Sequence, residues 1–335
     1  MKVSRLGVVM LAPVLLGLLA LGGTAQGANQ RALPKATQIM NWFPEPEHGG
    51  QYAAMQNGLY TKMGVDMSIG TFNPKGGNCE PLVATGRVDF CMDNADGLLQ
   101  ARQAGIPVVG VFTMFQINPQ GIMWHAADTT MHGVADLSNH TFIYSFGAAY
   151  WDFMKAKYHY KNVKEQANDY SLQLFSANPK GVNQIYVTSE PFTAMDKGMK
   201  VKWALIADSG YNPYAQIMVT SEANIKQRPA MVRAFVQASA TGWKTYLANP
   251  EKVFTYIKAL PAAKNWPMTK QAMRFSFQEI RDRHMVTGGA AKDHGIGYTN
   301  PQGMALLKKQ MVSVGIKLDK VDVSKAFTNQ FLAGM

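Results

Sequence analysis

The residues best suited to chemistry lie in short polar turns that follow apolar segments. The segment NWFPEPEHGG (41–50) places aromatic rings beside acids and an imidazole just ahead of a predicted helix: Trp42, Phe43, Glu45, Glu47 and His48. Aromatic rings offer flat faces for stacking, and carboxylates accept hydrogen bonds from N–H groups. The alternative is a structural role, in which the tryptophan fills the core and the acids stabilise the positive end of the helix.

Later turns of the same kind supply further candidate ligand-binding residues. They are Gly77, Asn78, Asp93, Asn94, Phe146, Tyr150, Tyr186, Glu190, Asp208 and Tyr211. Carboxylates and aromatic rings dominate these turns, and the nearby cations are Lys75 and Lys180. The set favours a planar ligand that carries amino groups or ring nitrogens. A small anion is the alternative, held by backbone N–H groups in PKGGNC (74–79), although unpaired carboxylates would repel it by roughly 1 kcal/mol.

Catalytic and metal-binding patterns are weak. No serine stands in a Gly-x-Ser-x-Gly context, and no histidine pair has His-Glu-x-x-His spacing. A metal bound by Glu45, Glu47 and His48 is disfavoured, because adjacent residues rarely converge on one ion. We therefore predict a protein that is not an enzyme and has no cofactor or metal. An exported enzyme that uses Asp93 and Asp96 for acid–base chemistry is the alternative.

Apolar and helical segments alternate along the first part of the chain. Strands are predicted at 38–42, 65–72, 88–92 and 106–115, with helices at 49–63, 79–85 and 95–104. This alternation favours parallel β-α units, in which ligands bind beyond the carboxyl ends of the strands.

A second set of strands and helices begins near Leu137, and helical periodicity dominates after Pro229. We predict an α/β protein of two lobes with a ligand cleft between them. Lobe 1 comprises 36–118 and 220–335, lobe 2 comprises 119–219, and the final helices pack back on lobe 1.

The N-terminus has the order of a secretory signal peptide, predicted at 1–27. Lys2 and Arg5 precede an apolar run from Leu6 to Leu21, and Ala25-Gln26-Gly27 offers a cleavage site. The run is shorter than the roughly 20 residues of a spanning helix, which disfavours the alternative of a retained anchor. We expect cleavage near Gly27 and a periplasmic or otherwise extracytoplasmic protein.

Charge and cysteine content restrict the partners and the compartment. The net charge is +11 over 335 residues, but the cations are scattered, which favours a solvated surface and no nucleic-acid partner. We expect a monomer. Cys79 and Cys91 are compatible with one disulfide in an oxidising compartment, and two buried thiols are the alternative.

Four segments carry a family resemblance: NWFPEPEHGGQYAAMQNGLYTKMGVDM, ATGRVDF, YVTSEPF and RPAMVRAFVQASATGWKTYLANP. They resemble bacterial solute-binding proteins of the thiamine-pyrimidine-precursor type, within a wider group that binds sulfonates, taurine, nitrate and riboflavin. The resemblance implies a type II periplasmic-binding-protein fold with two hinged lobes, which delivers its ligand to the permease and ATPase subunits of an ABC importer. Glu190 matches the acid that hydrogen-bonds an aminopyrimidine, and Trp42 matches a strand-end aromatic.

Eukaryotic relatives on this fold are single-turnover hydroxymethylpyrimidine phosphate synthases, and the chain departs from them. Asp93 and Gly97 stand where those proteins have a lysine and a histidine, and SGYNPYAQ (209–216) replaces their cysteine-rich run. The resemblance therefore implies a binding protein for an aminopyrimidine thiamine precursor. The alternatives are a binder of a small anion (alkanesulfonate, taurine or nitrate), the exported enzyme, and a sensor-input domain that docks on a membrane receptor.

Overall fold

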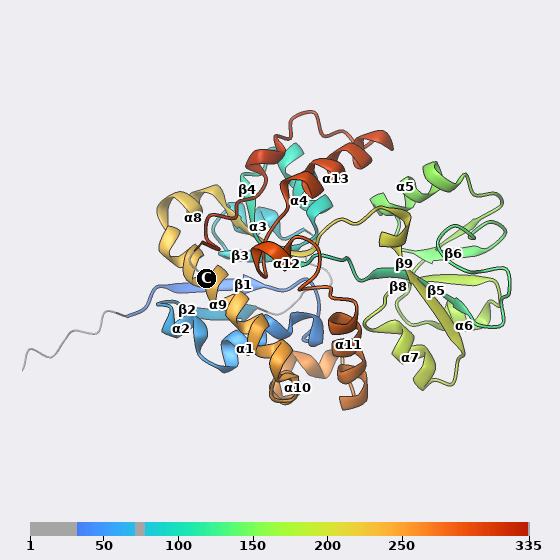
Figure 1. The fold of residues 1–335 in the computed structure, drawn as a ribbon, viewed down its shortest axis with the longest axis horizontal. Helices are drawn as coiled ribbons and strands as arrows, with labels where there is room; N and C mark the ends of the chain where they lie inside the picture. The colour runs from blue at the N-terminus through green and yellow to red at the C-terminus, as the bar shows by residue number, and fades with distance from the viewer. Residues whose placement is uncertain (1–31, 71–77, 334–335) are drawn as a thin grey trace, which may run out of the picture. The chain divides into compact units, whose positions relative to one another are not determined.

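The computed structural model describes residues 32–70 and 78–333, which contain two five-stranded sheets flanked by helices (Figure 1). From Leu33 onward the chain forms one compact unit. The predicted signal peptide, its cleavage site and Gly77 lie outside the described residues.

The first sheet has the strand order β2-β1-β3-β10-β4. Its strands are β1 (Lys35–Ile39), β2 (Asp66–Gly70), β3 (Phe90–Asp93), β4 (Val108–Phe115) and β10 (Ala215–Ser221). β1 runs parallel to β2 and β3, whereas β10 runs antiparallel to β3 and β4. Every residue of β4 and β10 is buried, as expected for strands covered on both faces.

The second sheet has the order β7-β6-β8-β5-β9. Its strands are β5 (Gln120–His125), β6 (Thr141–Tyr144), β7 (Lys164–Ala167), β8 (Gly181–Tyr186) and β9 (Val201–Leu205). β6 is parallel to β7 and β8, but β5 is antiparallel to β8 and β9. The α/β class is therefore confirmed, while the expectation of parallel strands holds for only part of each sheet.

Two segments carry the chain between the sheets, 116–119 on the way out and 206–214 on the way back. Hydrogen bonds of two asparagines hold the two segments side by side. The Asn118 N–H donates to Asn212 Oδ1 at 2.9 Å, and Asn212 Nδ2 donates to the Gln116 carbonyl at 2.9 Å. The predicted lobe boundary at 118/119 falls in the first crossing, and the one at 219/220 falls within β10. The lobe boundaries stay a prediction.

The predicted helix at 49–63 is two helices, α1 (Gly49–Gln56) and α2 (Leu59–Lys62). Gly58 separates them with a φ of +61°, a left-handed conformation that glycine adopts at little cost. α9 (Pro229–Ala248) packs on α1 so closely that a Cβ at Gly50 would lie 2.2 Å from the Trp243 ring. The glycines at the start of α1 therefore serve helix packing.

The remaining helices surround the two sheets. They are η1 (Pro46–His48), α3 (Glu80–Ala84), α4 (Ala95–Gln103), α5 (Ala149–Tyr158), α6 (Gln173–Ala177), α7 (Glu190–Asp196), η2 (Ile206–Ser209), α8 (Glu222–Gln227), α10 (Pro250–Ala259), η3 (Pro261–Asn265), α11 (Lys270–Asp282), α12 (Ala291–His294), α13 (Pro301–Ser313) and η4 (Val323–Lys325). The final helices contact both groups, since α13 packs on α4 and α5, and α11 packs on η1 and α7. They thus reach beyond the first sheet, to which the prediction assigned them.

A disulfide joins Cys79, just before α3, to Cys91 in β3, with 6.1 Å between the Cα atoms. The sequence was compatible both with this disulfide and with two buried thiols. The bond fixes the start of α3 against the sheet, next to the segment 71–77 that lies outside the described residues.

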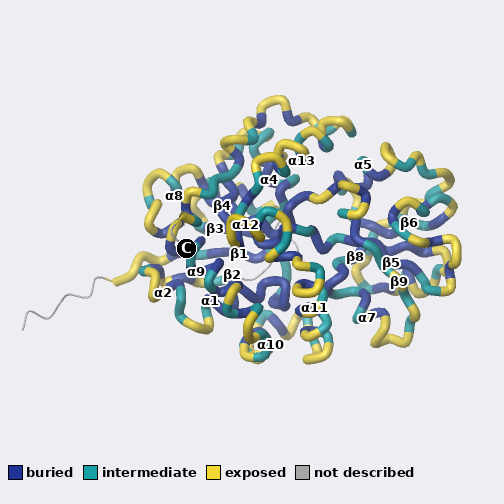
Figure 2. Tube along the Cα trace, in the orientation of Figure 1, coloured by how far each residue is buried: buried dark blue, intermediate teal, exposed yellow. Residues whose placement is uncertain are grey.

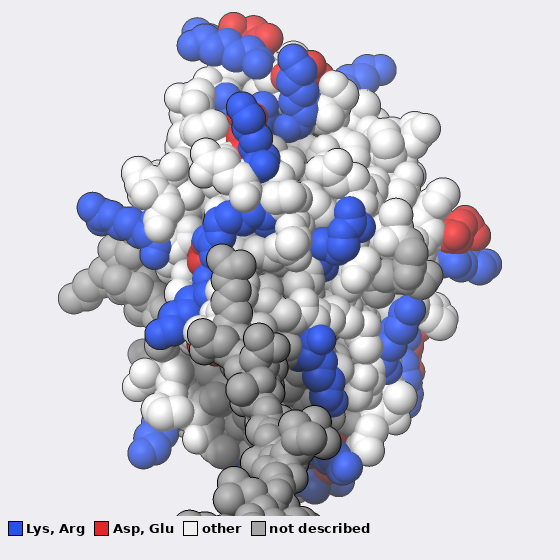
Figure 3. Space-filling model, turned by 90° about the vertical axis from the view of Figure 1, so that its left-hand side faces the viewer, with Lys and Arg blue, Asp and Glu red and all other residues white. Residues whose placement is uncertain are grey.

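Buried residues follow the strands of both sheets and the inner faces of the helices, and exposed residues occupy the outer helix faces and loops (Figure 2). Lys and Arg side chains are spread over the face drawn in Figure 3, with acidic side chains beside several of them. Within 32–70 and 78–333, no helix combines the length and apolarity needed to cross a bilayer.

Candidate functional site

The turn after β1 carries the acidic and aromatic residues singled out in the sequence. Glu45 has an extended backbone (φ −151°) directly before η1, and Pro46 occupies the first turn of that helix, where its fixed φ is favourable. Glu45 and Glu47 are 4% and 1% exposed. Both acids are therefore removed from water, unlike helix-capping acids on a surface.

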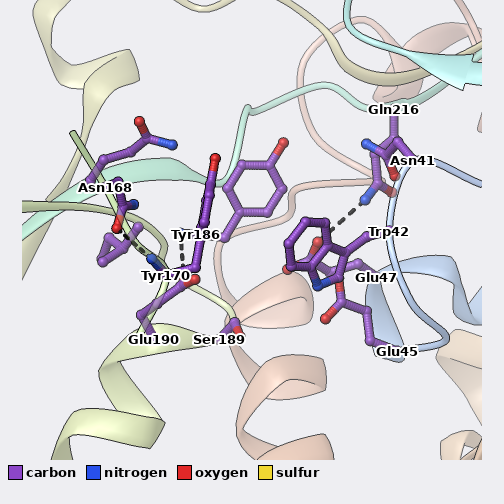
Figure 4. Close-up of a pocket in the computed structure, with 12 residues that line it drawn as sticks. Asn41, Trp42, Glu45, Glu47, Asn168, Tyr170, Tyr186, Ser189, Glu190 and Gln216 are labelled. Atoms are coloured by element: carbon purple, nitrogen blue, oxygen red, sulfur yellow. Dashed lines mark hydrogen bonds between the residues drawn. The ribbon is translucent and has the colours of Figure 1, made fainter. Parts of the chain in front are cut away.

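A cavity of about 130 Å³ opens beside this turn (Figure 4). Residues from both sheets and their loops line it: Asn41, Trp42, Glu45, Glu47, Asn168, Tyr170, Gln184, Ile185, Tyr186, Ser189, Glu190 and Gln216. We call it the first cavity. Four residues predicted as ligand-binding thus line one cavity, namely Trp42, Glu45, Tyr186 and Glu190, and Glu47, the second acid of the same turn, lines it as well.

Three carboxyl groups surround the first cavity, and each has hydrogen-bond partners. Glu47 accepts from the Thr188 hydroxyl through Oε1 and from Gln216 Nε2 through Oε2 at 3.3 Å. Glu190 begins α7, and its Oε2 accepts from the Tyr186 N–H at 2.8 Å. Glu45 hydrogen-bonds to Glu47.

Burial raises the pKa of all three carboxyls. The pKa of Glu47 rises to about 8 and that of Glu190 to about 7, while the pKa of Glu45 lies well above its usual range. The charge of one acid also raises the pKa of its neighbours. At neutral pH the cluster therefore retains protons, so it can donate hydrogen bonds as well as accept them.

Aromatic rings form the apolar part of the wall. The ring of Trp42 lies 5.9 Å from that of Tyr170 and 5.5 Å from that of Trp266, measured between centroids. Figure 4 shows Trp42, Glu45 and Glu47 on one side of the cavity and Tyr186 and Glu190 on the other. A planar ligand between them would meet a ring face and several carboxyl oxygens.

A second cavity, of about 220 Å³, lies next to the first and shares Gln184 with it. Its lining residues are Asn94, Asp96, Asn118, Gln120, Ser145, Ala148, Tyr150, Gln184, Ile206, Tyr211 and Pro213. Three predicted residues, Asn94, Tyr150 and Tyr211, thus belong to this cavity.

Several predicted residues line neither cavity. His48 is fully buried with Nε2 3.2 Å from Asn41 Oδ1, and burial lowers its pKa to about 3, so the ring is neutral. Phe43 stacks on Trp266 at 6.2 Å, Phe146 is 62% exposed, and Asn78 and Asp208 are exposed. His48 thus supports the turn through Asn41, which does line the first cavity.

Asp93 and Asp96 have different surroundings. Its carboxyl hydrogen-bonds to Glu80 and packs under α4, where a Cβ at Gly97 would be 2.2 Å from Oδ2. Burial raises its pKa well above the usual range. Asp96 lines the second cavity, whereas Asp93 lines none of those described, although the charge of Asp96 also raises the pKa of Asp93.

Five further residues line the first cavity without having been predicted from the sequence: Gln184, Gln216, Asn168, Tyr170 and Ser189. A signal existed for two of them. Gln184 lies beside Asn183 in VNQIYV and Gln216 lies in AQIMVTS, where amides interrupt a largely apolar strand. A buried amide needs partners, so such an interruption indicates a polar contact inside the protein. Among the described residues, no group of three His, Cys, Asp or Glu side chains is arranged to hold a metal ion.

Two mixed sheets, two crossings and a cavity lined from both sides define the class of the molecule, which has the periplasmic-binding-protein fold. The chain belongs to the NMT1/THI5-like family, whose model matches residues 45–253. The family resemblance read from the sequence is thereby confirmed.

Two relatives have names that state a ligand. The riboflavin-binding protein RibY of Chloroflexus aurantiacus is 27% identical over 317 residues, which covers 91% of this chain and 88% of RibY. The formylaminopyrimidine-binding protein of Halalkalibacterium halodurans is 20% identical over 268 residues, covering 78% of this chain and 81% of that protein.

Solved structures share the fold at low identity. The aliphatic sulphonate-binding protein SsuA of Escherichia coli matches with a TM-score of 0.68 at 12% identity, over 89% of this chain and 93% of SsuA. The desulfurization enzyme DszB matches with a TM-score of 0.59 at 11% identity, over 89% of this chain and 97% of DszB. The fold therefore occurs in binding proteins and in an enzyme, and function must be argued from the site.

Proposed function

We propose that the protein is the solute-binding component of an ABC importer and that it captures a planar nitrogen heterocycle, such as an aminopyrimidine thiamine precursor, in the first cavity. The NMT1/THI5-like family and the two named relatives support this proposal. Both relatives are named for ligands that contain a nitrogen ring, which agrees with the chemistry of the cavity.

The carboxyl cluster is the observation that carries the proposal. An aminopyrimidine places N–H donors beside a ring nitrogen that accepts. A cluster that retains a proton at neutral pH offers the matching acceptor and donor, because one oxygen accepts from the amino group while a protonated one donates to the ring. Trp42, Tyr170 and Tyr186 offer ring faces on which the ligand stacks.

A small anion such as an alkanesulfonate is the second candidate, favoured by the likeness to SsuA. Among the described residues that line the first cavity there is no Lys or Arg. An anion there would have to rely on neutral donors, and any ionised carboxylate would repel it. The heterocycle is therefore the better match.

Capture needs no bond chemistry. The two crossings, tied together through Asn118 and Asn212, are the natural hinge between the sheets. The hydrogen bond from Thr188 to Glu47 joins a loop of the second sheet to the turn after β1. Closure about the hinge would bring these groups around the ligand, and reopening would release it to the permease.

Export is part of the proposal. The predicted signal peptide directs the chain out of the cytoplasm, and the Cys79–Cys91 disulfide suits an oxidising compartment. The partners would be a membrane permease and its ATPase, with the binding protein acting as a monomer.

The test is isothermal titration calorimetry of 4-amino-2-methylpyrimidine against the purified protein and three variants. Loss of a charge-assisted hydrogen bond lowers a binding affinity roughly 10- to 150-fold, and Glu190→Ala should lower the affinity for the pyrimidine by that factor. Glu47→Gln should also lower this affinity. Glu222→Gln is the matched control, because Glu222 is an exposed glutamate on α8 that lines no described cavity. Unchanged affinity in a folded Glu190→Ala protein would refute the assignment.

A further inference from the structure

The second cavity has the features of a binding site in its own right. Its described lining is mostly neutral and polar, with one carboxyl group, that of Asp96, and no Lys or Arg. Such a lining suits uncharged groups that both donate and accept hydrogen bonds, and hydroxyls are the simplest of these. A phosphate would find no cation there.

Tyr211 is the least satisfied polar residue of this cavity. It is 0% exposed, and among the described residues its hydroxyl has no hydrogen-bond partner. A buried hydroxyl without a partner costs free energy, so its presence calls for a partner that the protein itself does not supply.

Hydrogen-bonded pairs form the wall between the two cavities. Gln184 lines both, and its Oε1 accepts from the Tyr150 hydroxyl and from the Ser145 N–H, each at 2.7 Å. The Ser145 hydroxyl also bonds to the hydroxyl of Tyr170, which lines the first cavity, at 2.7 Å. The Tyr186 hydroxyl hydrogen-bonds to Asn94 in the same way across the wall.

This wall orients Gln184 toward both sides. Because Oε1 is held by two donors, the amide orientation is fixed, and Nε2 donates to no residue in the described ranges. The amide nitrogen is thus a free donor at the junction of the two cavities. The cavities measure about 130 and 220 Å³, together about 350 Å³, which reaches the roughly 300–1,000 Å³ typical of small-molecule pockets.

We propose that the second cavity binds a neutral, hydroxyl-bearing substituent of the same ligand whose ring occupies the first cavity. This inference rests on the proposed function and adds the second half of the ligand. Tyr211 and Asp96 contact the hydroxyls, and Gln184 contacts the atom at which the substituent leaves the ring.

The test uses three matched pairs of ligands that differ in a hydroxyl-bearing substituent. They are 4-amino-2-methylpyrimidine with its 5-hydroxymethyl derivative, cytosine with cytidine, and lumiflavin with riboflavin. Affinities are measured by calorimetry for the wild type, Tyr211→Phe, Asp96→Asn and Glu190→Gln. Tyr158→Phe is the control, since Tyr158 lines neither cavity.

In at least one pair, the hydroxylated member should bind the wild type more tightly. Tyr211→Phe and Asp96→Asn should each reduce that preference by about 3- to 10-fold, which is the change in affinity expected when one hydrogen bond is lost. Glu190→Gln should weaken both members of the pair. Thermal denaturation should find Tyr211→Phe at least as stable as the wild type, because the lost hydroxyl has no partner in the described chain.

Three results would overturn the inference. If the preference survives both second-cavity variants while Glu190→Gln still weakens binding, the second cavity is not used and the proposed function stands. If the 5′-phosphate of cytidine or riboflavin binds more tightly than the unphosphorylated compound, the substituent is not neutral. If no member of any pair binds the wild type, the proposed function fails and the inference fails with it.

Discussion

Replacement of Glu47 by glutamine should destabilise the protein at acid pH and stabilise it at alkaline pH. Glu47 is 1% exposed and its pKa is raised from 4.5 to about 8, chiefly by burial. Between these values the folded protein holds a proton that the unfolded chain has released. The free energy of unfolding of the wild type therefore falls as the pH rises through this range.

The magnitude follows from the size of the shift. A rise of the pKa from 4.5 to about 8, at about 1.4 kcal/mol per pH unit, corresponds to about 5 kcal/mol in all, of which about 4 kcal/mol is lost between pH 4.5 and pH 8. Glu47→Gln has nearly the same shape as the protonated acid, but it cannot ionise. Its amide nitrogen cannot accept one of the hydrogen bonds that Thr188 and Gln216 donate to Glu47, so the variant should be about 1–3 kcal/mol less stable than the wild type at pH 5. At pH 8.5 the variant should be the more stable protein by about 1–3 kcal/mol, because the wild type has by then lost about 4 kcal/mol.

Urea denaturation at a series of pH values from 5 to 8.5 measures this difference. The wild type, Glu47→Gln and the control Glu222→Gln are compared, and the control should differ from the wild type by a constant amount. A Glu47→Gln profile that runs parallel to that of the wild type, or a variant less stable than the wild type at pH 8.5, would show that Glu47 does not keep its proton in the folded protein.

Three further predictions concern the disulfide, the helix packing and the pH dependence of binding. Replacing Cys79 and Cys91 together by alanine should cost about 3 kcal/mol in urea denaturation, as expected for a loop of about 12 residues; equal stability would contradict this. Gly242→Ala should cost about 1–3 kcal/mol and lower the melting temperature, because its Cβ would lie 2.2 Å from the Gly50 carbonyl oxygen; an unchanged melting temperature would count against the packing of α9 on α1. The affinity for an aminopyrimidine should fall about tenfold per pH unit above pH 8, because Glu47 loses the proton that it donates to the ligand. Calorimetry that finds a rising affinity above pH 8 would exclude this hydrogen bond.

The positions of most strands could be predicted, whereas their directions could not. Runs such as 106–115 are apolar throughout, and the structure has β4 there, buried along its whole length. A strand buried on both faces looks the same in either direction, so β10 gave no sign of being antiparallel, and β5 was not predicted as a strand at all. Their direction is set by the two crossings between sheets, which depend on the tertiary fold.

The candidate site could be predicted where polarity and chain position coincide. Trp42, Glu45 and Glu190 follow strands, Tyr186 ends one, and all four line the first cavity. Turn position alone was less informative, since Phe146 also follows a strand and is 62% exposed.

The amides Gln184 and Gln216 were overlooked because they lie within strands. Their role depends on partners distant in the sequence, Tyr150 for Gln184 and Glu47 for Gln216. Such pairings become visible only when the second sheet and the turn after β1 are seen together.

We expect the first cavity to prefer a planar nitrogen heterocycle to an oxyanion. The most direct test of this preference is a pair of calorimetric titrations of the same wild-type sample at pH 7, one with 4-amino-5-hydroxymethyl-2-methylpyrimidine and one with ethanesulfonate. The carboxyl cluster predicts saturable binding of the pyrimidine and an affinity for the sulfonate lower by at least about tenfold. Tight binding of the sulfonate with no heat from the pyrimidine would contradict the account.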